Sequence, residues 1–203
     1  MKKLSRKSAL LLGGMMAVCA FAAPMASAAS WAIGGTDHVL ASANLSFTGT
    51  YGPNRLGLSC ADTEFAAHVT SAAVLAVNTA AFRNCMGTFV TTNCTSTVSP
   101  TGLPWQATAV TTTNIQIHNV DLDVLFENTP GAGSACPLLG ASVRLTGTLT
   151  GGVWDPSATG ANRRITFNEA DGLTGHSEQL GGAAPWFTTG AFRDTTATLN
   201  VFG

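Results

Sequence analysis

The chain has 203 residues, of which 45% are hydrophobic and 10% are charged, and its formal net charge is −1. Globular domains carry roughly 25% charged residues, whereas disordered segments combine low hydrophobicity with high charge. The composition therefore predicts a folded domain with a nearly neutral surface. It disfavours a nucleic-acid-binding protein, which needs a basic patch.

The first 28 residues have the pattern of a secretory signal. Positive residues stand within the first seven positions, an apolar run covers residues 9–23, and Ala26-Ser27-Ala28 supplies the small residues of a cleavage site. The apolar run is too short to cross a bilayer comfortably. We therefore expect residues 1–28 to be removed and residues 29–203 to form one secreted domain, extracellular or associated with the cell surface, with no transmembrane segment.

Loss of the signal changes the charge balance. Four of the ten Lys and Arg residues lie in the signal, so six arginines remain against 11 acidic residues, a formal charge of −5 with no lysine. Lysine commonly protects the exposed edges of sheets. We therefore expect the sheet edges to be covered, closed, protected by proline and bulges, or used for pairing with another chain.

Four cysteines remain in the expected mature chain: Cys60, Cys85, Cys94 and Cys136. An even number in an exported chain predicts two disulfides, for which three pairings exist. A zinc site is the alternative, but no C-x-x-C spacing occurs. If the segments around the first two cysteines form a hairpin centred between Ala72 and Ala73, Cys60 lies opposite Cys85, close to disulfide reach. Cys94 then pairs with Cys136 by elimination.

Alternation of apolar and polar residues with a period of two is the strongest repeated pattern, and it is typical of β-strands. It is clearest over residues 43–51, 56–60, 120–126, 143–150 and 197–201. Clusters of Gly, Pro, Asn and Asp separate such runs. The spacing predicts an all-β fold, an antiparallel β-sandwich of the Ig-like or Greek-key type with 8–10 strands. Residues 155–185 show the least regular pattern, and we expect a long loop there.

Two segments depart from simple alternation. The alternating phase shifts at His118-Asn119, which is the effect of a β-bulge. The alanine-rich stretch 65–82 fits a helix or a strand, and its valines and threonines favour a strand.

Candidate catalytic groups are sparse. His118 stands near Asp121 and Asp123, which suggests either a metal or acid–base cluster or, as we favour, solvent-facing residues beside a bulge. Calcium usually takes 6–8 oxygen ligands, more than these two carboxylates offer. The segment Gly175-His176-Ser177-Glu178 holds the residue types of a hydrolase, but adjacency in sequence is not triad geometry. We therefore predict no catalytic residues, no metal and no cofactor, and infer that the protein is not an enzyme.

The tryptophans offer candidate contacts. Trp105, which follows Gly102-Leu103-Pro104, is predicted to be a buried anchor. Trp154 and Trp186 stand beside turns, where they would either cap the ends of the core, as we favour, or form a patch that contacts carbohydrate or lipid. We retain both residues as candidate surface or ligand contacts.

Four short motifs occur in order along the chain: Leu58-Ser59-Cys60, Phe82-Arg83-Asn84-Cys85-Met86-Gly87, Gly102-Leu103-Pro104-Trp105 and Gly133-Ser134-Ala135-Cys136. Through them the region 45–150 resembles small secreted β-sandwich proteins of actinobacteria and is similar to the protein activator of alkane oxidation family. The resemblance implies an extracellular, non-catalytic protein connected with surface, biofilm or hydrophobic-substrate behaviour. It transfers no catalytic residues.

The sequence supports three functional hypotheses. The first is a secreted structural or surface-associated protein that acts through its faces and strand edges. Its partners would be copies of itself, through exchange of segment 41–51, or the cell envelope or a hydrophobic surface. The second is an extracellular carrier of apolar small molecules, which predicts a concave apolar pocket. The third and least favoured is a secreted hydrolase that uses His118 or His176.

Overall fold

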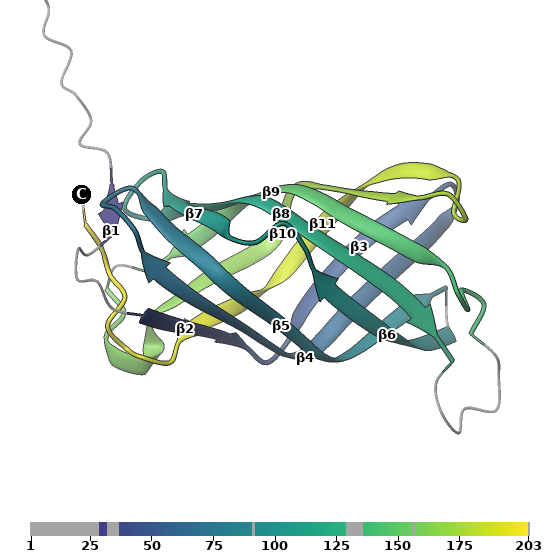
Figure 1. Cartoon of the computed structure of the whole chain (residues 1–203), viewed down its shortest axis with the longest axis horizontal. Helices are drawn as coiled ribbons and strands as arrows, with labels where there is room; N and C mark the ends of the chain where they lie inside the picture. The colour runs from purple at the N-terminus through teal and green to yellow at the C-terminus, as the bar shows by residue number, and fades with distance from the viewer. Residues whose placement is uncertain (1–28, 32–36, 91, 129–135, 156, 203) are drawn as a thin grey trace, which may run out of the picture.

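The structure is a computed structural model that describes residues 29–31, 37–90, 92–128, 136–155 and 157–202 (Figure 1). The predicted signal peptide lies outside these residues. The described chain contains twelve strands, one short 3-10 turn at Gly160–Asn162, and no α-helix. Among the described residues, no helix has the length and apolar character needed to cross a membrane.

Ten of the strands form one antiparallel sheet, and the short β1 and β12 pair with each other. This confirms the all-β antiparallel fold. The strands are β1 (Ser30–Trp31), β2 (Asp37–Ser42), β3 (Leu45–Tyr51), β4 (Asn54–Val69), β5 (Val74–Phe89), β6 (Thr92–Pro100), β7 (Trp105–Ala109), β8 (Asn114–Glu127), β9 (Ser142–Trp154), β10 (Arg164–Ser177), β11 (Gly182–Asp194) and β12 (Val201–Phe202).

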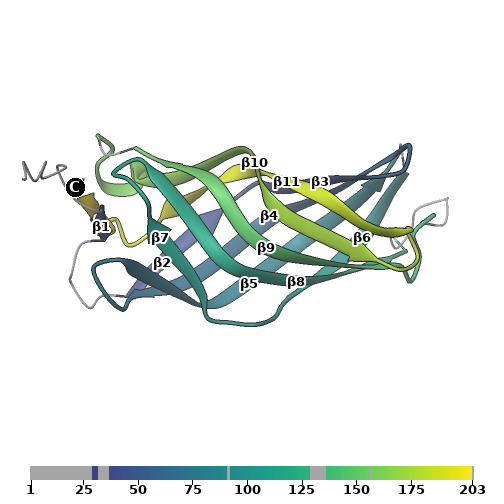
Figure 2. The same ribbon diagram turned by 90° about the horizontal axis from the view of Figure 1, so that it is seen from above.

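The large sheet closes on itself. Most strands that follow one another in the chain are paired as a meander, the exceptions being β2 with β3 and β6 with β7, and β11 returns to pair with both β2 and β3. β2 and β3 each lie between β4 and β11, while β6 and β7 each lie between β5 and β8. β2 and β3 therefore share one strand position of the sheet, which is interrupted midway, and β6 and β7 share another in the same way. Figure 2 shows β8, β9 and β10 crossing in front of β4 and β5, so the two layers of the sandwich are hydrogen-bonded to each other along both sides.

The disulfides match the pairing predicted from the register. Cys60 lies directly opposite Cys85 in the β4–β5 pair, and the two are joined with a Cα–Cα distance of 4.0 Å. Cys94 is joined to Cys136 with a Cα–Cα distance of 5.2 Å. All four residues are buried, so both bridges strengthen the interior of the closed sheet.

Bulges account for one prediction that is confirmed and one that is wrong. The predicted bulge in β8 is present, with a register shift between Ile117 and Val120 and a positive φ of 60° at Asn119. The predicted long loop at 155–185 is instead largely the hairpin of β10 and β11. Two register shifts in β10, between Phe167 and Ala170 and between Ala170 and Leu173, reset its alternation and hide the strand pattern.

All four tryptophans lie in a single core between the layers, each with an exposed fraction of 1% or less. Trp31 enters from β1 at one end, where its indole Nε1 donates to the carbonyl of Ala107 at 3.2 Å. Trp186 lies against Gly49 and Gly175, where an added Cβ would come within 2.4 and 2.1 Å of its Nε1. The absence of side chains at these two positions makes room for the ring.

Candidate functional site

The tryptophans considered as surface contacts are buried. Trp154 is 1% exposed, and Trp186 is fully buried with its Nε1 donating to the Tyr51 hydroxyl at 3.2 Å. The predicted exposed patch is therefore wrong for both residues, because each occupies an inward-facing position of its strand. The burial of Trp105 is confirmed, and its Nε1 donates to the carbonyl of Thr101 at 2.9 Å.

The groups around the β8 bulge do not converge on one point. His118 lies with Nε2 2.8 Å from the Thr108 hydroxyl and is held by that neighbouring strand. Arg144 donates from Nε and Nη2 to the two carboxylate oxygens of Asp121 at 2.9 and 2.6 Å. This bidentate contact holds the pKa of the Asp121 carboxyl below its usual value. Asp123 lies opposite Arg144 in the register of β8 and β9.

No group of three or more His, Cys, Asp or Glu side chains in the described parts of the chain is placed to hold a metal ion.

The hydrolase-like segment lies at the end of β10. His176 is exposed on the outer face, whereas Ser177 is 3% exposed on the inner side of the strand. The Ser177 hydroxyl donates to Oε1 of Gln179 at 3.3 Å. Because successive residues of a strand point to opposite faces, this histidine does not act as a base toward its neighbouring serine.

A buried polar cluster that sequence reasoning missed joins β2 to the end of β11. The fully buried Asp194 carboxylate accepts hydrogen bonds from the backbone N–H groups of Thr196, Thr198 and Leu199 at 3.1, 2.8 and 2.7 Å. His38, 2% exposed, places Nδ1 3.8 Å from this carboxylate. Burial lowers the pKa of His38, which outweighs the opposing effect of Asp194.

This cluster anchors the segment that follows β11. The run Asp194-Thr195-Thr196 is a turn signal that the sequence offers. Nothing in the sequence pattern, however, links it to a histidine 156 residues earlier. The hydrogen bonds of Asp194 come from backbone N–H groups and the Thr196 hydroxyl within the next five residues, so the cluster is best explained as part of the fold.

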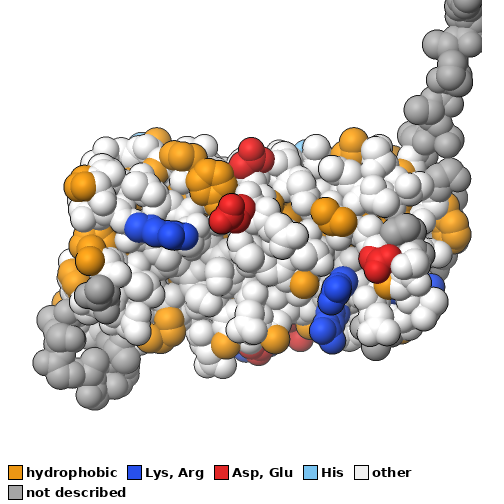
Figure 3. All heavy atoms as spheres, turned by 180° about the vertical axis from the view of Figure 1, so that it is seen from behind, with side chains coloured by type: hydrophobic (Ala, Val, Ile, Leu, Met, Phe, Trp, Pro, Cys, Tyr) orange, Lys and Arg blue, Asp and Glu red, His pale blue; other side chains and the backbone are white. Residues whose placement is uncertain are grey.

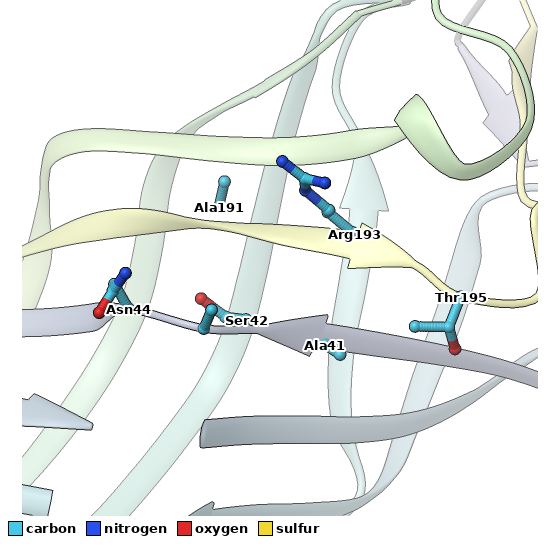
Figure 4. A pocket seen from close by; sticks show the side chains of 7 residues that line it. Ala41, Ser42, Asn44, Ala191, Arg193 and Thr195 are labelled. Carbon is cyan, nitrogen blue, oxygen red and sulfur yellow. The ribbon is translucent and has the colours of Figure 1, made fainter. Parts of the chain in front are cut away.

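The clearest concave surface lies where β2 breaks off and β3 begins (Figure 4). A hollow of about 490 Å³ opens there on the outer face. Its lining consists of small and polar side chains and one cation: Ala41, Ser42, Ala43, Asn44, Ala191, Arg193 and Thr195.

The hollow follows from the strand pairing. β11 pairs with β3 through Trp186–Thr189 and with β2 through Arg193–Asp194. The intervening residues 190–192 therefore have no strand partner on that side among the described residues. A second hollow, of about 480 Å³, lies beside the other interrupted strand and is bordered by Gly102 and Thr148. Each of the two breaks is thus accompanied by a hollow on the outer wall.

Comparison of the chain with protein-family models, with curated proteins and with solved structures gave no match. The resemblance to the protein activator of alkane oxidation family therefore depends on the ordered sequence motifs alone.

Proposed function

We propose that this is a secreted, non-catalytic structural or surface-associated protein that acts through its outer wall and ends. The observation that carries the proposal is the closed sheet around a filled core. The four tryptophans occupy the interior, and the described hollows lie on the outside. A carrier of apolar molecules needs an interior cavity, and a hydrolase needs converging catalytic groups, so the geometry supports these alternatives less well.

The outer wall carries few charged side chains. Figure 3 shows a face on which charged side chains are few and scattered, with most of the surface formed by other polar groups and backbone. Two disulfides are consistent with an oxidising extracellular environment. A wall of hydroxyl and amide groups without strong fields suits a protein that stands in a crowded extracellular layer.

Exposed apolar side chains mark the two ends. The hairpin pole is the end formed by the turns after β3, β5, β8 and β10, and it carries Val90 and Leu139, which are 63% and 57% exposed. The terminal pole, formed by β1, β12 and the turns after β4 and β7, carries Val110 and Val153. Val90 has a positive φ of 56°, a costly conformation for a β-branched residue. Its exposed position at the tip supports contact of the hairpin pole with a hydrophobic surface.

Self-association is the second part of the proposal. Exchange of segment 41–51 would require β2 and β3 to leave their partners on both sides, β4 and β11. Copies of the protein would meet more readily through their outer faces and poles. Either route gives an extracellular assembly, and the two are separable by experiment.

Export and surface contact are tested together. Full-length protein and a variant lacking residues 1–28 are expressed in a bacterial host, and the culture medium, envelope and cytoplasm are assayed. We expect the full-length protein alone to leave the cytoplasm.

Binding of the purified domain to hexadecane droplets should fall at least threefold in Val90→Ser/Leu139→Ser and remain in the control Val110→Ser/Val153→Ser. Two results would contradict the proposal: retention of the full-length protein in the cytoplasm together with the truncated one, or equal droplet binding by the wild type and both serine variants.

Assembly is tested by light scattering and electron microscopy over a concentration series. Ser46 and Ser59 lie opposite each other with their hydroxyl oxygens 3.2 Å apart, so Ser46→Cys/Ser59→Cys locks β3 to β4. Oligomers that persist in the locked protein indicate assembly through faces, and oligomers that disappear indicate strand exchange. A strict monomer at every concentration would remove self-association from the proposal.

A further inference from the structure

Two arginines face each other on neighbouring strands. Arg164 begins β10 and lies directly opposite Arg193 near the end of β11. The next pair along, Ile165 and Phe192, is 1% exposed and faces the core, so both arginines face outward. Residues opposed in this way have Cβ atoms about 4.5–5.5 Å apart. The two guanidinium groups are thus held on one patch of the wall.

The pair is costly for the isolated protein, since like charges directly opposite each other are destabilising. Two of the other arginines are paired with carboxylates, Arg83 with Asp62 and Arg144 with Asp121. Neither member of the Arg164–Arg193 pair forms a salt bridge within the described residues.

The carboxylate of Asp155, which lines a hollow beside the pair, accepts hydrogen bonds within its own turn. Its Oδ1 accepts hydrogen bonds from the Ser157 hydroxyl and backbone N–H at 2.7 and 2.9 Å. These bonds hold the pKa of Asp155 below its usual value, with a smaller contribution from Arg164. The turn therefore keeps the aspartate ionised beside the two arginines, and one positive charge of the pair stays unbalanced.

A polar hollow lies beside the pair. It measures about 300 Å³, and Arg164 and Arg193 border it together with Asp155, Ser157, Ala158, Thr159 and Asn162. Arg193 extends from β11 at the border between this hollow and the one shown in Figure 4. The patch thus combines two guanidinium forks with hydroxyl and amide donors around one open space.

We propose that Arg164 and Arg193 form a binding site for a phosphate group. Guanidinium groups bind phosphate oxygens in bidentate fashion, and a phosphate group has enough oxygens to engage both forks at once, whereas a carboxylate has only two. The polar residues Thr159 and Asn162 also line the hollow. The site goes beyond the proposed surface role by assigning ligand chemistry to one place on the wall.

The test is calorimetric titration of the oxidised domain, residues 29–203, at constant ionic strength. Inorganic phosphate and glycerol 3-phosphate are the probes, and acetate is the monoanionic comparison. We expect saturable binding of phosphate, at least tenfold weaker binding in Arg164→Gln and Arg193→Gln, and an intermediate loss in Arg164→Lys, which keeps the charge but loses the fork. Arg55→Gln is the matched control, since Arg55 is an exposed arginine at a separate hollow.

Each outcome of the titration either supports or overturns the phosphate site. Binding of both probes, or of glycerol 3-phosphate alone, supports the site, and the second result identifies esterified phosphate as the source. Absence of saturable binding of both phosphate and glycerol 3-phosphate overturns the proposal, as does acetate binding of equal strength or an equal loss in Arg55→Gln. Thermal melts of every variant verify folding, and phosphate should raise the melting temperature of the wild type and of Arg55→Gln only. A negative result in the phosphate titration would not change the interpretation of the export and droplet-binding experiments.

Discussion

The contact between Gly175 and Trp186 allows a sharp test of the core. A Cβ added at Gly175 would lie 2.1 Å from the indole Nε1, 2.5 Å from Cδ1 and 2.7 Å from the Tyr51 hydroxyl oxygen. The ring cannot move away easily, because it is fully buried and lies against Gly49 on the neighbouring β3. Gly175→Ala must therefore displace the indole, the backbone of β10, or both.

The expected cost has two parts. Overpacking a well-filled core costs about 1–3 kcal/mol, and loss of the Trp186–Tyr51 hydrogen bond adds about 1 kcal/mol. The free energy of unfolding should therefore fall by about 2–4 kcal/mol. For a domain of this size, that corresponds to a decrease in Tm of roughly 5–15 °C.

Urea unfolding with the disulfides intact measures this change, followed by Trp fluorescence and circular dichroism. Gly57→Ala is the control, because its added Cβ meets nothing closer than the Thr88 Cβ at 3.8 Å. Trp186→Phe removes the Nε1 atom, so the effect of Gly175→Ala should be smaller in that background. If Gly175→Ala is as stable as Gly57→Ala, or if its cost is the same with Phe at 186, the packing argument is refuted.

Three further predictions concern the covalent and polar interactions of the fold. Replacing Cys94 and Cys136 by serine should lower the free energy of unfolding by about 4 kcal/mol, from the entropy of the 42-residue loop that the bridge closes; urea unfolding tests this, and an unchanged midpoint would contradict it. Because burial lowers the pKa of His38, the unfolded chain binds a proton first, so stability should fall as the pH drops below about 6.5. Unfolding measured at pH 7.5 and 5.5 should show a smaller loss for His38→Gln than for the wild type, and equal losses would count against this. Asp194→Ala leaves three backbone N–H groups without their acceptor and should cost at least about 3 kcal/mol; hydrogen exchange at the Leu199 amide should speed up before global unfolding, and unchanged protection there would refute the anchoring role.

Local patterns carried the successful predictions. The pairing of Cys60 with Cys85 follows from the register of one hairpin, which short-range symmetry about its turn defines. The bulge at His118-Asn119 was visible because clean alternation resumes on the other phase after it. In both cases the information lies within a few tens of residues.

Other features depend on long-range geometry or on ambiguous patterns. In β11, Trp186 and Phe187 are both apolar, so alternation does not say which faces inward; the structure buries the first and leaves the second 41% exposed. The opposition of Arg164 and Arg193 needs the register of β10 and β11, which the bulges of β10 obscure. Closure of the sheet by β11 has no local sequence signal at all.

The pairing of β1 with β12 sets the direction in which the molecule would point when tethered. Ser30 lies opposite Phe202, so the described domain begins and finishes at the terminal pole. A linker, a fusion partner or a solid support joined at either end would therefore hold the molecule by the same pole. The opposite pole, with Val90 and Leu139, would then be displayed outward, which makes either terminus a suitable handle for force spectroscopy or oriented immobilisation.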